Sequence, residues 1–182
     1  MRKLNGNLVP AYGEAPITLS EFEESHLVLL PGWLAMPHIT PWFPNSDEYL
    51  EFARQPPANG EQRTIIQANE PAGYLRWVIL SKEILDNAGF PELPAGTADA
   101  DLFLGEASNL GRGLGVEVLE ELSDRLARLG VPLLVLTTSV ENKRAQAAFR
   151  KAGFSVYREY EPEPFGRCYL MLRWLVQPEG GA

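Results

Sequence analysis

The chain has 182 residues, 45% of them hydrophobic and 22% charged, which is the composition of one ordinary globular domain. These figures exclude a disordered chain, a collagen-like repeat and a small scaffold built on disulfides. The formal net charge of −8 at pH 7 argues against nonspecific nucleic-acid binding and favours cationic partners. The single cysteine, Cys168, cannot form an internal disulfide, so we expect a cytoplasmic protein.

Hydrophobic patterning predicts short strands and helices along the chain. Strands are expected at residues 17–22, 63–68, 74–81, 99–105, 133–138, 154–161 and 168–175. Helices are expected at residues 27–36 with a break at Pro31, at 46–55, from the glycines at 111–115 to Gly130, and at 142–152. Residues 82–98 are expected to form one long loop, which in a compact domain is usually functional or mobile.

The ends of the chain and its composition set further expectations. Residues 1–15 show little periodicity and are expected to form a flexible leader, followed by the folded domain over 16–177 and a tail over 178–182. The apolar stretch at 27–36 is half a membrane span, so we expect no membrane partner. Two histidines and one cysteine make a metal site unexpected.

The most informative segment is Gly111-Arg112-Gly113-Leu114-Gly115, which leads into a strongly amphipathic helix. Alternate glycines let the backbone curl so that several N–H groups point at one spot, and the helix adds free N–H groups and its positive dipole end. A phosphate or pyrophosphate suits such a loop, and a glycine-rich turn that merely caps the helix is the alternative. The spacing matches neither a Walker loop nor the dinucleotide-binding fingerprint.

Two helices carry patterns of their own. In the first, Leu119, Leu122, Leu126 and Leu129 fall at helical spacing, and charges four residues apart predict the pairs Glu121–Arg125 and Asp124–Arg128. The helix at 142–152 places Asn142, Ala145 and Phe149 on one face, as a groove for a slim ligand arm. Lys143 and Arg144 stand at its dipole-unfavourable end, which indicates a nearby anion or else solvated surface charge.

These segments together resemble the GCN5-related N-acetyltransferases (the GNAT superfamily). In that family a Q/R-x-x-G-x-G/A loop binds the pyrophosphate of acetyl-CoA, and here it reads Leu110-Gly111-Arg112-Gly113-Leu114-Gly115. The later pattern N-x-x-A-x-x-x-Y-x-K-x-G-F is matched at Asn142, Ala145, Phe149, Lys151, Gly153 and Phe154. The stretch Trp33-Leu34-x-x-Pro37-His38-Ile39-x-x-Trp42 adds a third similarity. With these motifs, the chain is most similar to the aminoglycoside 6'-N-acetyltransferase branch and its siderophore-acyltransferase relatives, over residues 16–175.

The resemblance implies the fold and the cofactor. The fold would be a single α/β domain (α+β in stricter schemes) with a mixed, mostly antiparallel sheet, splayed central strands and flanking helices. The cofactor would be acetyl-CoA, with its pyrophosphate on the glycine-loop amides and its pantetheine arm beside the backbone of the strand at 99–105. The implied cofactor-binding residues are Phe103, Leu104, Gly105, Leu110, Gly111, Arg112, Gly113, Leu114, Gly115, Asn142, Ala145, Phe149 and Lys151.

The resemblance also implies direct attack of a neutral amine on the thioester, so that a carboxylate or a water chain must take the amine's proton. Asp101 matches the acidic residue of the aminoglycoside branch and is the first candidate for this proton acceptor. Asp99, two residues earlier on the same face, is the second candidate, and Glu106 is the third. The alternative is that these acids merely belong to a solvated strand edge. Phe149 replaces the tyrosine that commonly protonates the departing thiolate. Either the thiolate leaves unaided, another phenol such as Tyr157 reaches it, or CoA binds without turnover.

The expected acceptor pocket is rich in acids and aromatic rings. Residues 82–106 contain six acids and one lysine, and the terminal hairpin adds three more acids. The expected substrate-binding residues are Trp33, His38, Trp42, Asp86 and Glu161. Acidic and aromatic side chains suit a polyamine or an amino sugar as the acceptor. The alternative for the acids is that they belong to an ordinary acidic surface, and the alternative for His38 is a structural role.

We therefore expect an acetyl-CoA-dependent N-acetyltransferase that acts on a primary amine of a cationic small molecule such as an aminoglycoside, and thereby confers antibiotic resistance. One alternative is an acyl-CoA-dependent acyltransferase for a siderophore precursor or a polyamine. Another is a catalytically silent CoA-binding sensor, which the phenylalanine at 149 suggests. Homodimers are common in the family, although no residue pattern here indicates one.

Overall fold

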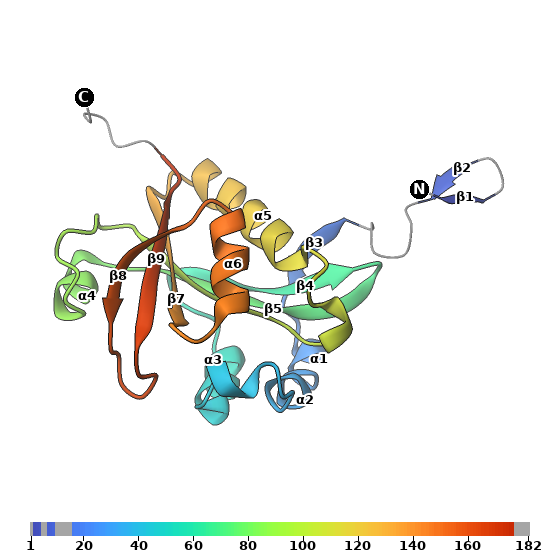
Figure 1. Ribbon diagram of the computed structural model, residues 1–182, viewed down its shortest axis with the longest axis horizontal. Coiled ribbons are helices and arrows are strands. Elements are labelled where there is room, and N and C mark those ends of the chain that lie inside the picture. Colours follow the sequence, from blue (N-terminus) through green and yellow to red (C-terminus); the bar gives the residue numbers. More distant parts are fainter. Residues whose placement is uncertain (1, 5–6, 10–15, 177–182) are drawn as a thin grey trace.

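The computed structural model describes residues 2–4, 7–9 and 16–176, and its centre is a seven-stranded sheet in the order β3-β4-β5-β6-β7-β9-β8 (Figure 1). The strands are β3 (Ile17–Glu21), β4 (Gly60–Gln67), β5 (Glu70–Ile79), β6 (Ala98–Leu104), β7 (Leu133–Ser139), β8 (Ser155–Tyr160) and β9 (Cys168–Trp174). Among the described strands, only the neighbours β6 and β7 are parallel, which confirms the expected mixed, mostly antiparallel sheet.

Helices cover both faces of the sheet. They are α1 (Glu24–Leu27), α2 (Leu30–Leu34), α3 (Ser46–Arg54), α4 (Lys82–Asn87), α5 (Leu114–Arg128) and α6 (Lys143–Lys151), with short 3₁₀ turns η1 (Thr40–Trp42) and η2 (Ala107–Asn109). In Figure 1, α5 lies above the sheet and α1, α2 and α3 lie below it. Within the described residues, no helix is long and apolar enough to cross a membrane.

Three apolar clusters hold these layers together. Leu119, Leu122 and Leu126 of α5 are fully buried against one sheet face, where Leu75 and Leu136 meet them. On the opposite face, one cluster joins α2 and α3 to Tyr74 and Phe103, and another joins α4 to β7 and β9. Ala98 and Ala100 of β6 belong to the cluster under α5, so Asp99 and Asp101, which alternate with them, lie on this opposite face.

The central strands separate along their length. β6 and β7 pair only at Ala98 with Leu134 and at Asp99 with Val135, although β6 continues to Leu104 and β7 to Ser139. No strand of the described residues therefore pairs with the rest of β6 on that side. This confirms the predicted splay and leaves free backbone groups beside the glycine loop.

Two segments differ from the sequence-based expectations. Residues 82–98 contain a helix rather than only a loop, because Ser81 caps α4 by accepting the Ile84 N–H at 3.2 Å and Leu85 is buried beneath it. In the expected leader, β1 (Arg2–Leu4) and β2 (Asn7–Val9) pair as a separate two-stranded sheet. The other residues of the leader and the tail at 178–182 lie outside the described residues.

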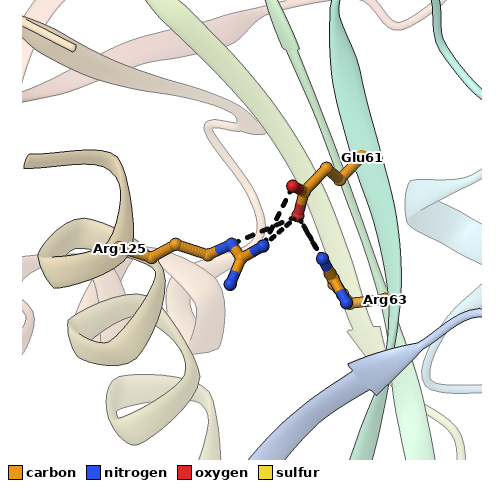
Figure 2. A network of polar contacts seen from close by, with 3 residues as sticks. All are labelled: Glu61, Arg63 and Arg125. Carbon is orange, nitrogen blue, oxygen red and sulfur yellow. Dashed lines mark hydrogen bonds and ion pairs between the residues drawn. The ribbon is translucent and has the colours of Figure 1, made fainter. Parts of the chain in front are cut away.

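The surface of α5 also differs from its expected pairing. Arg125 donates to both carboxylate oxygens of Glu61 on β4, at 2.9 Å each, and Arg63 donates to the same carboxylate (Figure 2). The predicted Glu121–Arg125 and Asp124–Arg128 ion pairs are not formed in the described part of the chain. A fork-shaped guanidinium gains more from a bidentate, half-buried carboxylate than from an exposed helix neighbour. Leu129 is 61% exposed because the helix ends at Arg128.

Candidate active site

The glycine loop presents free backbone donors. Gly111 and Gly113 have φ angles of +74° and +88°, which side-chain-bearing residues rarely adopt, and Gly113 is the N-cap of α5. Among the described residues, no backbone N–H from Gly111 through Gly115 donates an intramolecular hydrogen bond. The loop and the start of α5 therefore leave a row of N–H groups able to bind an anion, as the glycine spacing predicted.

A cavity of about 600 Å³, the loop cavity, runs from this loop to α6 and the free side of β6. Three cationic residues of α6 line it: Lys143, Arg144 and Lys151. Among the described lining residues, Glu141 is the single acid. The implied cofactor-binding residues that line it are Phe103, Leu104, Leu110, Gly111, Gly113, Leu114, Gly115, Asn142, Ala145, Phe149 and Lys151. The loop cavity is thus suited to an elongated ligand with an anionic end.

A second cavity of about 580 Å³, the acidic cavity, lies over the centre of the sheet between α3, β6, β7 and the terminal hairpin. Its acids are Glu48, Asp99, Asp101 and Glu163, and no lysine or arginine is among its described lining residues. Its aromatic residues are Trp42, Phe43, Tyr49, Phe52, Phe149, Tyr160 and Phe165. This lining favours a cationic ligand that can stack on rings.

The two cavities meet at one place. Phe149 and Ala145 of α6 and Leu102 of β6 line both of them, as do Trp42 and Phe43 of the segment before α3. Phe149 is 9% exposed and its ring packs against Phe154, so the ring is held in place where it lines both cavities. A group at the end of a ligand in the loop cavity would therefore face a ligand in the acidic cavity.

The carboxyl groups of Asp99 and Asp101 are the titratable groups that β6 contributes to the acidic cavity. Burial raises the pKa of Asp99 to about 7, and the nearby Asp101 carboxylate contributes in the same direction. Burial also raises the pKa of Asp101, while Arg76 opposes the increase. Burial likewise raises the pKa of Tyr160 to about 12, so its phenol is neutral at pH 7. Such a carboxyl pair is suited to accepting a proton near neutral pH.

Comparison with known proteins decides the family. A family model described as an acetyltransferase (GNAT) domain matches residues 23–161, which is most of the chain. The chain belongs to this GNAT acetyltransferase family. No curated protein sequence gives a significant match.

Several solved structures share the fold of this GNAT domain. AAC(6')-Ib in complex with ribostamycin and coenzyme A has a TM-score of 0.73 at 23% identity, over 92% of this chain and 99% of that chain. An aminoglycoside N(6')-acetyltransferase from Legionella pneumophila has a TM-score of 0.71 at 20% identity, over 89% and 94% of the two chains. A GNAT-family acetyltransferase from Streptococcus pneumoniae has a TM-score of 0.63 at 20% identity, over 87% and 98%.

Some implied cofactor and substrate residues of the GNAT domain lie outside the cavities. Trp33 is a core residue that packs edge-on against Phe103, and its indole lies against Gly105. The Trp33 indole fills the position that a side chain on Gly105 would take, and Gly105 is not among the lining residues of the loop cavity. The Arg112 side chain is exposed and is not among the lining residues of the loop cavity. Trp33 lines neither cavity, and Gly105 and Arg112 do not line the loop cavity.

The remaining expected site residues divide in the same way. His38 lines the loop cavity rather than the acidic one, with Nε2 3.0 Å from the Leu104 carbonyl oxygen, and Trp42 lines both cavities. Asp86 is exposed on α4 and pairs with Lys82, and Glu161 and Glu106 are exposed and line neither cavity.

Tyr157 does not reach the junction of the cavities. Its hydroxyl donates to the exposed Glu92 carboxylate, which Arg158 also binds, and this raises the pKa of Tyr157. The side chain is thus occupied on the outer surface of β8. The proposed role of Tyr157 as a proton donor is therefore incompatible with its position.

Sequence reasoning did not single out Tyr49, Tyr160 or Glu48 as site residues. Tyr49 and Glu48 come from α3, and Tyr160 ends β8, with its hydroxyl 2.7 Å from Thr137 Oγ1. The sequence pattern around them indicates only a helix start and a strand. They could not be identified as site residues, because only the tertiary fold brings α3 and β8 to the same cavity.

Proposed function

We propose that this GNAT domain transfers an acetyl group from acetyl-CoA to a primary amine of a cationic small molecule, with aminoglycosides as the first candidates. The observation that carries the proposal is the junction at Phe149 between a cavity with cationic side chains and a cavity with four acids. The opposite charges of the two cavities match a polyanionic acyl donor and a cationic acceptor.

The loop cavity fits coenzyme A in its chemistry. Free N–H groups from Gly111 to Gly115 would hold the pyrophosphate, and the cations at the start of α6 would balance its charge. The side of β6 that lacks a partner strand offers backbone groups to the amides of a pantetheine arm. Related structures were determined with CoA or acetyl-CoA bound, which supports this choice.

The acidic cavity fits an aminoglycoside-like acceptor. Its acids can bind several ammonium groups, and its rings can stack on sugar or polyamine faces. Similar folds were solved with paromomycin, ribostamycin and kanamycin, which supports a multiply charged amine as the acceptor class. An amine that also carries carboxylates would be repelled by the four acids.

The reaction needs a neutral amine beside the thioester carbon. We assign Asp101 as the group that accepts the proton of the acceptor's ammonium, directly or through water. The amine nitrogen then forms a bond to the acetyl carbon and gives up its second proton to water, and the carbon–sulfur bond breaks to release the thiolate. Phe149 cannot donate a proton, but a thiol with a pKa of about 8.5 departs readily as the thiolate near neutral pH.

A panel of acceptors tests the proposal. The full chain is incubated with acetyl-CoA and with aminoglycosides, polyamines or acidic amino acids, and released thiol is measured. We expect release with one or more of the cationic amines, little with the acidic ones, and a loss of about 100-fold in kcat/KM in Asp101→Asn. Asp86→Asn, which removes an acid outside both cavities, serves as the matched control. Absence of thiol release with every cationic amine would refute the acceptor class.

A second candidate function is CoA binding without turnover, which the phenylalanine at 149 favours because no phenol of α6 faces the junction. In that case calorimetry detects CoA binding while no acceptor or acyl-CoA releases thiol. A chain-length series from acetyl-CoA to longer acyl-CoA donors distinguishes the acetyltransferase from an acyltransferase for siderophore precursors.

A further inference from the structure

Arg76 of β5 stands directly opposite Asp101 of β6 in the antiparallel register, whereas Asp99 stands opposite Val78. Directly opposed residues of antiparallel strands share one face, with Cβ atoms about 5 Å apart, and diagonal neighbours are about 7 to 8 Å apart. Arg76 therefore lies on the face that carries the carboxyl pair and is a closer neighbour of Asp101 than of Asp99.

Among the described residues, the guanidinium of Arg76 forms no ion pair. Its Nε is buried without a hydrogen-bond partner, and no carboxylate lies within ion-pair distance of it among the described residues. Its central carbon stacks 5.1 Å from the ring centroid of Phe52, which lines the acidic cavity. A partly buried cation without direct pairing is costly unless nearby opposite charge compensates it.

The other titratable groups around the carboxyl pair are neutral or negative. They are Glu48 and Tyr49 from α3, Tyr74 from β5, Tyr160 from β8, Glu163 from the terminal hairpin and Cys168 from β9. Arg76 is thus the one cation in this group of described residues, and its charge acts unequally on the two carboxyl groups.

We infer that Arg76 is a positioning residue whose charge makes Asp101 the first of the two carboxyl groups to ionise and leaves the proton on Asp99. This inference rests on the proposed function for its catalytic meaning, because the ionised Asp101 is the group assigned to accept the amine's proton. Two further effects agree with it: the Asp101 carboxylate raises the pKa of Asp99, and Arg76 lowers the pKa of both. The protonated Asp99 can then donate a hydrogen bond within the same cavity.

Carbon NMR of the full chain labelled at aspartate carboxyl carbons tests the order of ionisation without any acetyl transfer. Asp99→Asn and Asp101→Asn assign the two signals. In the wild type we expect the Asp101 midpoint below that of Asp99, and in Arg76→Gln an Asp101 midpoint higher by about one pH unit. Arg76→Lys should retain most of the wild-type midpoint. Arg63→Gln, which removes a half-buried arginine from the other sheet face, should leave it unchanged.

The two single aspartate variants keep the test decisive if Arg76→Gln does not fold. Asp101→Asn should lower the Asp99 midpoint by removing a like charge, whereas Asp99→Asn should leave the Asp101 midpoint nearly unchanged. An Asp99 that ionises first, or an Asp101 midpoint unaffected by Arg76→Gln, would overturn the inference. If an acceptor is found, the acidic limb of kcat/KM should shift with the NMR midpoint. If none is found, the proposed function fails while the titration still decides the role of Arg76.

Discussion

The indole of Trp33 occupies the space that a side chain on Gly105 would need: a Cβ atom built on Gly105 would lie 2.2 Å from both Cε2 and Nε1 of Trp33. Because Trp33 is buried against Phe103, it cannot move aside cheaply. We predict that Gly105→Ala lowers the free energy of unfolding by about 1 to 3 kcal/mol through overpacking.

Urea unfolding measures this effect, and Gly115→Ala is its matched control. Gly115 lies in the first turn of α5, with open space around a built Cβ, so the added methyl should be neutral or stabilising by up to about 1 kcal/mol. Equal stabilities of Gly105→Ala and Gly115→Ala would show that the Trp33–Gly105 contact is not tight.

The Glu61–Arg125 contact joins β4 to α5 (Figure 2). Burial alone would raise the pKa of Glu61, but hydrogen bonds from Arg125 and Arg63 outweigh it and lower the pKa. In a double-mutant cycle of Glu61→Gln and Arg125→Gln, we expect a coupling of about 0.5 to 1 kcal/mol at pH 7, limited by the partial exposure of both side chains.

The pH dependence of that coupling follows from the lowered pKa. The contribution is complete above the unfolded pKa of about 4.3 and is lost as pH falls through the lower folded value. The exposed Arg128→Gln on the same helix should change stability very little. A coupling that is independent of pH down to about 2, or a large effect of Arg128→Gln, would contradict this account.

Asp99 should make the protein less stable as the pH rises. Its folded-state pKa of about 7 exceeds the unfolded value of about 3.9, so between these values the folded state holds a proton that the unfolded state releases. The free energy of unfolding therefore falls through this window. We predict that Asp99→Asn exceeds the wild type in stability by about 4 kcal/mol at pH 8 but matches it near pH 4, as measured by urea unfolding. A difference of the same size at both pH values would exclude this origin.

Phe149 and Tyr157 together test how the thiolate departs. Tyr157→Phe should leave kcat unchanged, because the hydroxyl is bound to Glu92 outside both cavities. Phe149→Tyr should raise kcat by less than about threefold, since the thiolate of a thiol with a pKa of about 8.5 is already a good leaving group. Steady-state kinetics between pH 6 and 9 measure both, and a gain of more than about tenfold in Phe149→Tyr would show that proton donation limits the rate.

Local patterns explain which parts of the site could be predicted from the sequence. The free amides at Gly111–Gly115 depend on neighbouring residues, and Asp99 and Asp101 share a face because side chains alternate along a strand. The splay of β6 and β7 came from the family resemblance. Each of these features could be predicted because it depends on a single segment of the chain, or on an arrangement of segments known from the family.

The misplaced residues depend on contacts between distant segments. Trp33 was expected in the acceptor pocket because it precedes an aromatic loop, but the missing side chain of Gly105 gives it a place in the core. Arg125 has a suitable partner on its own helix, yet Glu61 on β4 offers a bidentate one. Tyr49 reaches the acidic cavity only because the fold brings α3 to a cavity that residues 99–102 of β6 also line. The spacing of residues along the chain does not indicate which of several possible contact partners a side chain will take in the fold.

Calorimetry with coenzyme A tests the central claim most directly, because every functional argument depends on the loop cavity as the site of the acyl donor. We predict that the wild type binds CoA with a dissociation constant of about 1 μM to 1 mM, and that Gly113→Val weakens binding at least about tenfold. Gly130→Val, which places the same side chain on a residue of similar φ at the other end of α5, should bind like the wild type. A wild type that takes up no CoA, or a Gly113→Val that binds it equally well, would contradict the account.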